Sequence, residues 1–168
     1  MTQLEHPIFP LLNEINIAAE KGLPLLAISM TVALPDICVS LISKDGRTDS
    51  RRYKEWCDNN LGTEFSYVTS NDLYSMRCGV LHNGRFGDLK HEVGRVIFAL
   101  DGAEMVNCKF NDAYIYSAPN FCRNFTVAVH NWIQENYENS IFKENTKRLI
   151  QFHPNGLAPY LIGPTVIA

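Results

Sequence analysis

The sequence has no excess of positive charge. Its 168 residues carry 15 Lys and Arg against 18 Asp and Glu, which gives a formal net charge of −3 and a pI of about 5.9. Proteins that bind nucleic acid tightly through many phosphates usually carry a large basic excess. The charge balance therefore argues against tight, non-specific binding to nucleic acid.

The cysteines form no CxxC pair and are odd in number, which argues against both a disulfide framework and a zinc finger. The first ten residues lack a basic stretch followed by an apolar core, the pattern of a secretory leader. We therefore expect a reduced, cytoplasmic protein that needs no cofactor or metal.

Internal repeats and low-complexity segments are also absent, and the length suits one domain with a hydrophobic core. We predict a single domain over residues 1–168. Residues 23–42 are apolar over the length of a membrane-spanning helix, but they include Pro35 and Asp36. A carboxylate in the bilayer costs roughly 2.5–3.5 kcal/mol, so we interpret this stretch as the central helix of a globular domain, with no membrane partner.

Several segments repeat apolar residues at spacings of three and four, the period of an amphipathic helix. Pro35 is expected to kink or divide the second segment. Thr69 or Ser70 is expected to cap the fourth, and Asn83-Gly84 to end it. The fold class is therefore mainly α, a bundle of about five to six helices over residues 3–21, 25–43, 50–61, 73–82, 121–137 and 144–152.

Two short runs break the helical pattern. Residues 95–100 (RVIFAL) and 113–117 (AYIYS) are rich in β-branched and aromatic residues, and Asp101-Gly102 is a turn dipeptide. They predict a β-hairpin or two-stranded sheet over residues 95–117. The tail, residues 156–168, is apolar but broken by Pro and Gly, so we expect it to pack over the core or to meet another chain.

Arg77 and His82 are the candidate catalytic pair. An imidazole can act as general acid or base near neutral pH, and a guanidinium can stabilise charge that develops on a phosphate. An Arg and a following His with four to six residues between them occur four times in the chain. Arg85 and His91 lie in a Gly-containing loop, His130 faces an apolar neighbourhood beside Trp132, and His153 precedes Pro154. Arg77 and His82 share one capped helix, so the context selects this pair.

Residues 73–84 (LYSMRCGVLHNG) resemble the signature helix of bacterial HEPN proteins, in which Arg-x(4–6)-His marks the functional site. Three further pieces resemble recurrent features of that superfamily: residues 35–38 (PDIC), residues 53–56 (YKEW), and Phe121-Cys122 with Trp132. Together they span most of the chain.

The resemblance implies a helical bundle that dimerises, so that two copies of the motif face each other across a metal-independent ribonuclease site. It implies that His82 assists proton transfer from the 2′-hydroxyl and that Arg77 stabilises the transition state. Asp36 would orient Arg77, with Cys78 and Asn83 as supporting neighbours. Cys78 departs from the family pattern, because many active members carry a polar residue there.

A local basic patch formed by Arg47, Arg51, Arg52 and Arg85 is a second candidate, for binding; the alternative is a solvated helix face. For His82 the structural alternative is a helix C-terminal cation, and for Asp36 a buried, paired carboxylate.

Two further sets of side chains have simpler interpretations. Tyr53, Trp56 and Trp132 are expected to be core residues. Cys78, His82 and His91 could ligate a metal ion, but no fourth ligand is evident, so we expect none.

Three functions remain open at this stage. The first is a ribonuclease of the toxin or phage-defence type that acts on RNA as a homodimer. The second is a non-catalytic module that binds nucleotide, RNA or protein. The third is an antitoxin or immunity-type protein that neutralises a cognate toxin by contact. The motif favours the first two, whereas the acidic charge and Cys78 favour the last two.

Overall fold

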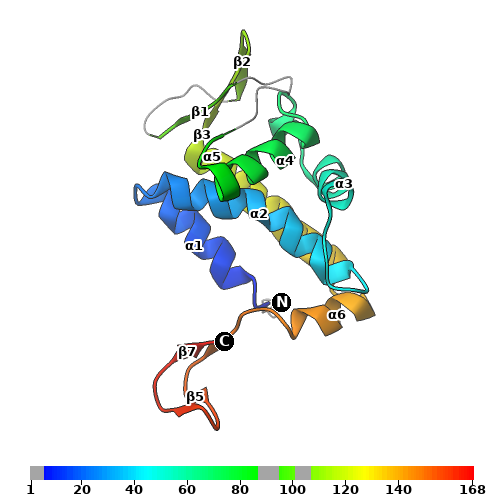
Figure 1. The fold of residues 1–168 in the computed structure, drawn as a ribbon, viewed down its shortest axis with the longest axis vertical. Coiled ribbons are helices and arrows are strands. Elements are labelled where there is room, and N and C mark those ends of the chain that lie inside the picture. Colours follow the sequence, from blue (N-terminus) through cyan, green and yellow to red (C-terminus); the bar gives the residue numbers. More distant parts are fainter. Residues whose placement is uncertain (1–5, 87–94, 101–106) are drawn as a thin grey trace.

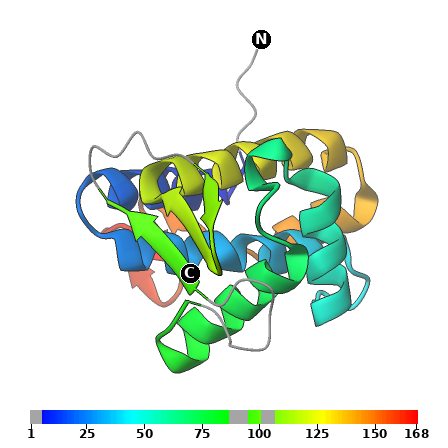
Figure 2. The same cartoon turned by 90° about the horizontal axis from the view of Figure 1, so that it is seen from above.

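The computed structural model describes residues 6–86, 95–100 and 107–168. This part of the chain is a bundle of six α-helices with small β-sheets at its two ends (Figures 1 and 2). The prediction of a mainly α bundle is therefore confirmed at this level. The helices are α1 (Phe9–Glu20), α2 (Pro24–Ile42), α3 (Ser50–Asn60), α4 (Ser70–Cys78), α5 (Ala118–Asn136) and α6 (Ser140–Thr146), with a 3-10 turn η1 (Thr63–Phe65) and a π turn η2 (Gly79–Asn83).

Helix α2 runs through the middle of the bundle and contacts all five other α-helices. It continues through Pro35, so that residue does not divide it. By length and composition alone α2 could cross a membrane, but half of its apolar stretch is buried inside the fold. This burial agrees with the interpretation of residues 23–42 as a core helix.

The core is rich in aromatic side chains. Phe65, Phe121 and Phe125 pack with ring centroids 5.1–5.6 Å apart, and Trp56 meets Trp132 edge to face at 6.2 Å. Aromatic pairs at such separations stabilise a fold beyond the area they bury. The prediction that Tyr53, Trp56 and Trp132 are core residues is confirmed, since each is at most 5% exposed.

Two predicted helix boundaries were wrong. Among the described residues α1 begins at Phe9, because Pro10 has no N–H and is tolerated only in the first turn of a helix; residues 3–5 lie outside the described part. Helix α6 covers Ser140–Thr146 instead of 144–152, because the Asn139 side chain accepts hydrogen bonds from the amides of Ile141 and Phe142 and so fixes an earlier start.

Residues 95–99 and 113–117 form strands that pair with each other in one sheet, as predicted, but the hairpin alternative was wrong. β1 (Arg95–Ala99) pairs parallel with β3 (Ala113–Ser117), and hairpin arms must be antiparallel. The described hairpin joins β2 (Cys108–Phe110) to β3, which places β3 at the centre of a three-stranded sheet. The predicted turn at Asp101-Gly102 lies outside the described residues.

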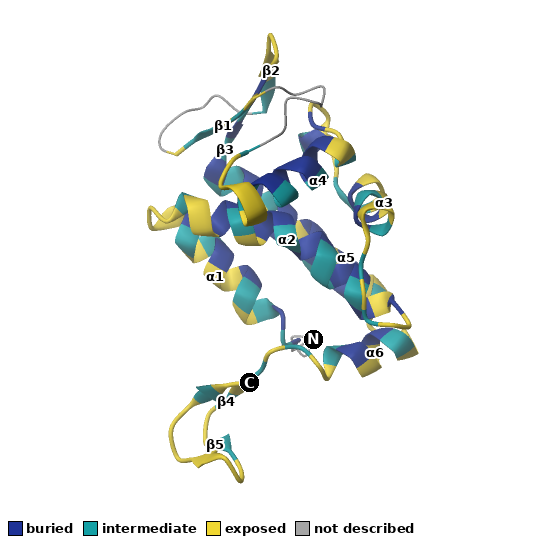
Figure 3. Ribbon diagram, in the orientation of Figure 1, coloured by how far each residue is buried: buried dark blue, intermediate teal, exposed yellow. Residues whose placement is uncertain are grey.

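The tail does not pack over the core. It forms two short antiparallel strand pairs that hang below the helices (Figure 1), and most of its residues are exposed (Figure 3). The first of the two alternatives for residues 156–168 is therefore wrong. The strands are β4 (Phe152–His153), β5 (Gly156–Leu157), β6 (Leu161–Ile162) and β7 (Val166–Ile167).

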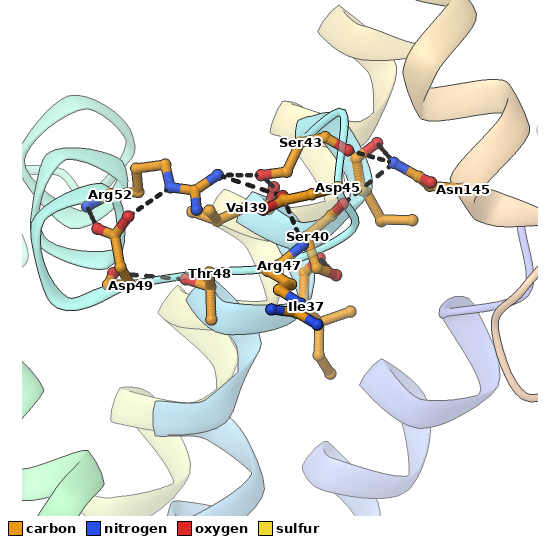
Figure 4. A network of polar contacts seen from close by, with 11 residues as sticks. Ile37, Val39, Ser40, Ser43, Asp45, Arg47, Thr48, Asp49, Arg52 and Asn145 are labelled. Carbon is orange, nitrogen blue, oxygen red and sulfur yellow. Dashed lines mark hydrogen bonds and ion pairs between the residues drawn. The ribbon is translucent and has the colours of Figure 1, made fainter.

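A polar network joins the end of α2 to α3 and α6 (Figure 4). The side-chain nitrogen Nδ2 of Asn145 donates to the backbone carbonyl oxygens of Ser40, Leu41 and Ser43 at 2.8–3.2 Å. Carbonyls in the last turn of a helix have no partner within the helix, so a side chain from another element satisfies them here. Helix α6 thus fixes the end of the central helix.

Candidate functional site

Arg77 is held by a carboxylate from the central helix. Its Nε donates to Asp36 Oδ2 at 2.6 Å, and the two side chains are only 23% and 15% exposed. Partial burial lowers the pKa of Arg77, but the hydrogen bond and the Coulomb attraction of Asp36 raise it by more, so the pKa lies above its ordinary value. The guanidinium is therefore charged and fixed in direction, as the sequence predicted for Asp36.

His82 lies against the same guanidinium. Its Nε2 is 3.4 Å from Arg77 Nη1. A guanidinium only donates hydrogen bonds, so this contact requires a lone pair on Nε2 and the ring proton on Nδ1. The nitrogen that faces Arg77 is thus the one that can accept a proton.

A change of helix type makes this contact. In a regular α-helix, side chains five residues apart point about 140° away from each other. From Gly79 the helix widens into the π turn η2, in which the N–H of Gly84 donates to the carbonyl of Gly79. Such a turn closes over five residues and brings His82 back to the side of Arg77.

Both ends of this helical segment are fixed by short-range chemistry. Thr69 and Asp72 form a reciprocal capping box at the start of α4. At the other end Gly84 adopts a left-handed conformation with φ +64°, which ends the helix directly after Asn83. The predicted cap and the predicted helix end are confirmed. Asn83 is exposed beside His82 in the chain.

Tyr74 lies outside the Arg/His motif but next to Arg77, and Lys54 lies over the Tyr74 ring. Tyr74, one turn before Arg77 on α4, packs edge to face on Tyr53 at 5.2 Å, and Lys54 Nζ lies 5.2 Å from the centre of the Tyr74 ring. Burial and the nearby Cys78 raise the pKa of Tyr74, so its phenol is neutral near pH 7 and can donate a hydrogen bond. The spacing of residues 74, 77 and 78 along one helix face could have identified Tyr74, whereas Lys54 approaches through tertiary packing.

Cys78 is half-buried, with its sulfur 3.9 Å from Arg77 Nη1. A thiol is a weak acceptor and behaves as a small hydrophobic group when it is packed against other side chains. It therefore fills space beside Arg77 and does not compete with Asp36 for the guanidinium.

Two members of the predicted basic patch are paired with carboxylates. Arg52 is bound by Asp49 at 2.8 Å and by Ser43 at 2.7 Å in the network at the end of α2 (Figure 4), and Arg51 pairs with Glu55. These carboxylates neutralise much of the positive charge of α3. Arg47 lies in the turn before α3, and Arg85 is exposed just after η2.

The other Arg/His spacings bring no such pair together in the described residues. His130 stacks on Phe9 with ring centroids 5.0 Å apart, and Arg123 pairs with Glu20. Neither Arg148 nor His153 contacts the other through a hydrogen bond, and His91 lies outside the described part. Arg77 and His82 are therefore the pair whose side chains meet.

A cleft of about 830 Å³ opens on the other side of α3, between the ends of α2 and α5, and is lined by Arg52, Trp56 and Trp132 among others. Asp36, Arg77 and His82 do not line it. No group of three or more potential metal ligands occurs among residues 6–86, 95–100 and 107–168.

No protein-family model, curated protein or solved structure matches this chain. The function must therefore be argued from the site itself.

Proposed function

We propose that the protein is a HEPN-type, metal-independent RNA endonuclease in which Arg77 and His82 carry the chemistry. The observation that supports this most directly is the contact between Arg77 Nη1 and His82 Nε2 at 3.4 Å, with Asp36 behind the arginine at 2.6 Å. A fixed cation beside a proton-accepting imidazole is the combination that cleavage by a 2′-hydroxyl requires.

The reaction would proceed by transfer within the RNA. When the substrate phosphate takes over the N–H groups of Arg77, the lone pair of His82 Nε2 becomes free and accepts the proton of the 2′-hydroxyl. The 2′-oxygen then attacks phosphorus to form a 2′,3′-cyclic phosphate. The P–O5′ bond breaks, and the departing oxygen takes a proton from water. Arg77 donates hydrogen bonds to the phosphate oxygens, where negative charge increases in the transition state.

Lys54 and Tyr74 are suited to bind the substrate. Lys54 is held over the Tyr74 ring and forms no ion pair within the described residues, so its ammonium is free to meet a phosphate. Tyr74 offers a neutral hydroxyl beside Arg77. Arg85, exposed after the π turn, would add a further phosphate contact along the strand.

We further propose that the enzyme acts as a homodimer in the cytoplasm, as a toxin or phage-defence nuclease. Two facing copies of η2 would place two Arg77–His82 pairs around one RNA strand. An isologous two-fold dimer is the commonest assembly that achieves this.

Cleavage of single-stranded and transfer RNA by the purified protein tests the proposal. We expect cleavage in the presence of a chelator, with products ending in a 2′,3′-cyclic phosphate. Arg77→Ala and His82→Ala should each lower the rate about 10²–10⁴-fold. Arg148→Ala, which removes an exposed arginine that lies in another of the Arg/His spacings, is the matched control and should leave the rate unchanged.

A second function, binding without cleavage, is favoured by the neutralisation of Arg77 by Asp36. A phosphate has to compete with this carboxylate, which suits recognition of a nucleotide, an RNA or a partner protein such as a cognate toxin. Wild-type protein that leaves RNA intact but loses such a partner on Arg77→Ala would support this function instead.

A further inference from the structure

The last described segment, residues 150–168, is here called the arm. It extends away from the helical body (Figure 1) and is largely exposed (Figure 3). Tyr160 is 84% exposed and Ile162 75% exposed. The large apolar side chains that the arm exposes are Ile150, Phe152, Tyr160, Leu161, Ile162 and Ile167.

The arm has little to hold it in place within its own chain. Each of its strand pairs contains strands of two residues, and a two-stranded pair is marginally stable in water. The arm also contains no Asp, Glu, Lys or Arg. An apolar segment of this kind, extended into solvent, indicates a surface that is covered in the assembled protein.

A second exposed apolar surface lies where α1 meets α2. This α1–α2 patch consists of Ile17, Leu23, Leu25, Leu26 and Met30, with Leu25 67% and Leu26 63% exposed. No charged residue occurs between Lys21 and Asp36. The patch and the arm therefore match in chemistry, since both are apolar and uncharged.

The two surfaces lie at opposite ends of α1. The arm follows α6, whose Thr146 contacts His6 just before α1, whereas the patch surrounds the end of α1. A helix of 12 residues is about 18 Å long, which separates the arm from the patch of its own chain. If two copies pack with their α1 helices antiparallel, the arm of each lies beside the patch of the other.

We propose that two copies of this chain exchange arms, each arm covering the α1–α2 patch of its partner. With on the order of 150 Å² for each fully exposed side chain, one arm and one patch offer roughly 1,000 Å² of apolar surface. Two-fold symmetry repeats the contact, which gives roughly 2,000 Å², against the 1,200–2,000 Å² typical of stable interfaces. A second copy is thus sufficient to cover both surfaces.

This inference does not rest on the proposed nuclease function. Its interface uses the arm and the α1–α2 patch, whereas the proposed active site uses α4 and η2. The experiment therefore measures assembly and not cleavage.

Light scattering at micromolar concentration should give a dimer for the wild type, or a tetramer if the η2 contact of the proposed nuclease forms as well. The double substitution Tyr160→Ser/Ile162→Ser should halve the mass of the wild-type assembly, and so should Leu25→Ser/Leu26→Ser, with helical circular dichroism unchanged. Phe110→Ser is the matched control, because Phe110 is 68% exposed on β2 and belongs to neither surface. That variant should keep the wild-type mass.

Cross-linking identifies the contact if either double variant fails to fold. Ile162→Cys and Leu26→Cys chains, tagged to different sizes and mixed, should form a disulfide-linked heterodimer, whereas Ile162→Cys with Phe110→Cys should not. A monomeric wild type would overturn the proposal. A dimer that survives the arm substitutions but is lost on Leu81→Ser in η2 would also overturn it. That result would instead support the dimer through η2 of the proposed nuclease. Flotation of monomeric wild type with phosphatidylcholine–phosphatidylglycerol vesicles would assign the arm to a membrane instead, and would also overturn it.

Discussion

At the scale of single residues, Arg77 is positioned by a partner 41 residues before it in the chain. The resemblance implied that Asp36 would orient Arg77, and the structural alternative for Asp36 was a carboxylate paired with Arg77 or another cation. The contributions of Tyr74 and Lys54 were not predicted. Neither residue belongs to an Arg/His spacing, and the contact between Lys54 and Tyr74 depends on how α3 packs against α4.

Asp36→Asn should lower the free energy of unfolding by about 1–3 kcal/mol, because Arg77 loses a charge-assisted hydrogen bond in a half-buried position. Urea denaturation measures the change. The control is Glu55→Gln, which disrupts an exposed pair with Arg51 and should cost under about 1 kcal/mol. Equal effects of the two substitutions would show that the Asp36–Arg77 pair does not stabilise the fold.

His6 is a buried, neutral histidine. Its Nδ1 accepts from the amide of Ile8 at 3.3 Å, so the ring proton lies on Nε2, which contacts Thr146 Oγ1 at 3.1 Å. Burial lowers the pKa of His6 from 6.5 to about 4. Protonation of Nδ1 would place two donors face to face and break the contact with Ile8.

This histidine should make stability depend on pH. Its contribution is complete above pH 6.5, where His6 is neutral in both states. As the pH falls from 6.5 to about 4, the unfolded chain binds a proton that the folded chain does not, so on the order of 1–3 kcal/mol of stability is lost. Urea denaturation across this range should show a smaller loss for His6→Gln than for the wild type, and an unchanged loss for His153→Gln. Parallel pH profiles for the wild type and His6→Gln would contradict the assignment.

At the scale of elements, the sequence predicted what local signals determine. The cap at Thr69 and the end at Gly84 follow from side chains near each boundary. The parallel pairing of β1 with β3 could not be predicted in this way, because parallel register depends on contacts between strands distant in sequence. The π turn was missed because periodic spacing assumes a regular helix.

Gly84→Ala should destabilise the protein by about 1–2 kcal/mol, because a Cβ is strained at φ +64° although open space surrounds it. Gly22→Ala is a close control, with φ +79° and the same open surroundings at the end of α1. Thermal unfolding should shift similarly for both. Only Gly84→Ala should also lower RNA cleavage, since it disturbs the turn that holds His82 against Arg77; equal cleavage by both variants would separate η2 from the activity.

At the scale of the whole molecule, helices α1 to α6 share one hydrophobic core in the described part of the chain. The sequence left open whether the tail packs over the core or meets another chain, because apolar composition alone does not say which surface covers it. Only the assembled helices show that residues 150–168 lie outside that core.

The shared core predicts a single cooperative unfolding transition. Trp56 and Trp132 are buried in contact with each other and report on α3 and α5, while far-ultraviolet circular dichroism reports on all helices. The midpoints from tryptophan fluorescence and circular dichroism should therefore coincide. Two separate midpoints would show that part of the bundle unfolds independently.

The bonds of Asn145 also bear on how the chain folds during its synthesis. The carbonyls at the end of α2 accept hydrogen bonds from the side chain of Asn145, which is translated 102 residues after Ser43. At 5–20 residues per second the ribosome needs roughly 5–20 s to supply it. Until then these carbonyls can form hydrogen bonds only with water. The end of α2 in the nascent chain is therefore fixed only when α6 emerges from the ribosome.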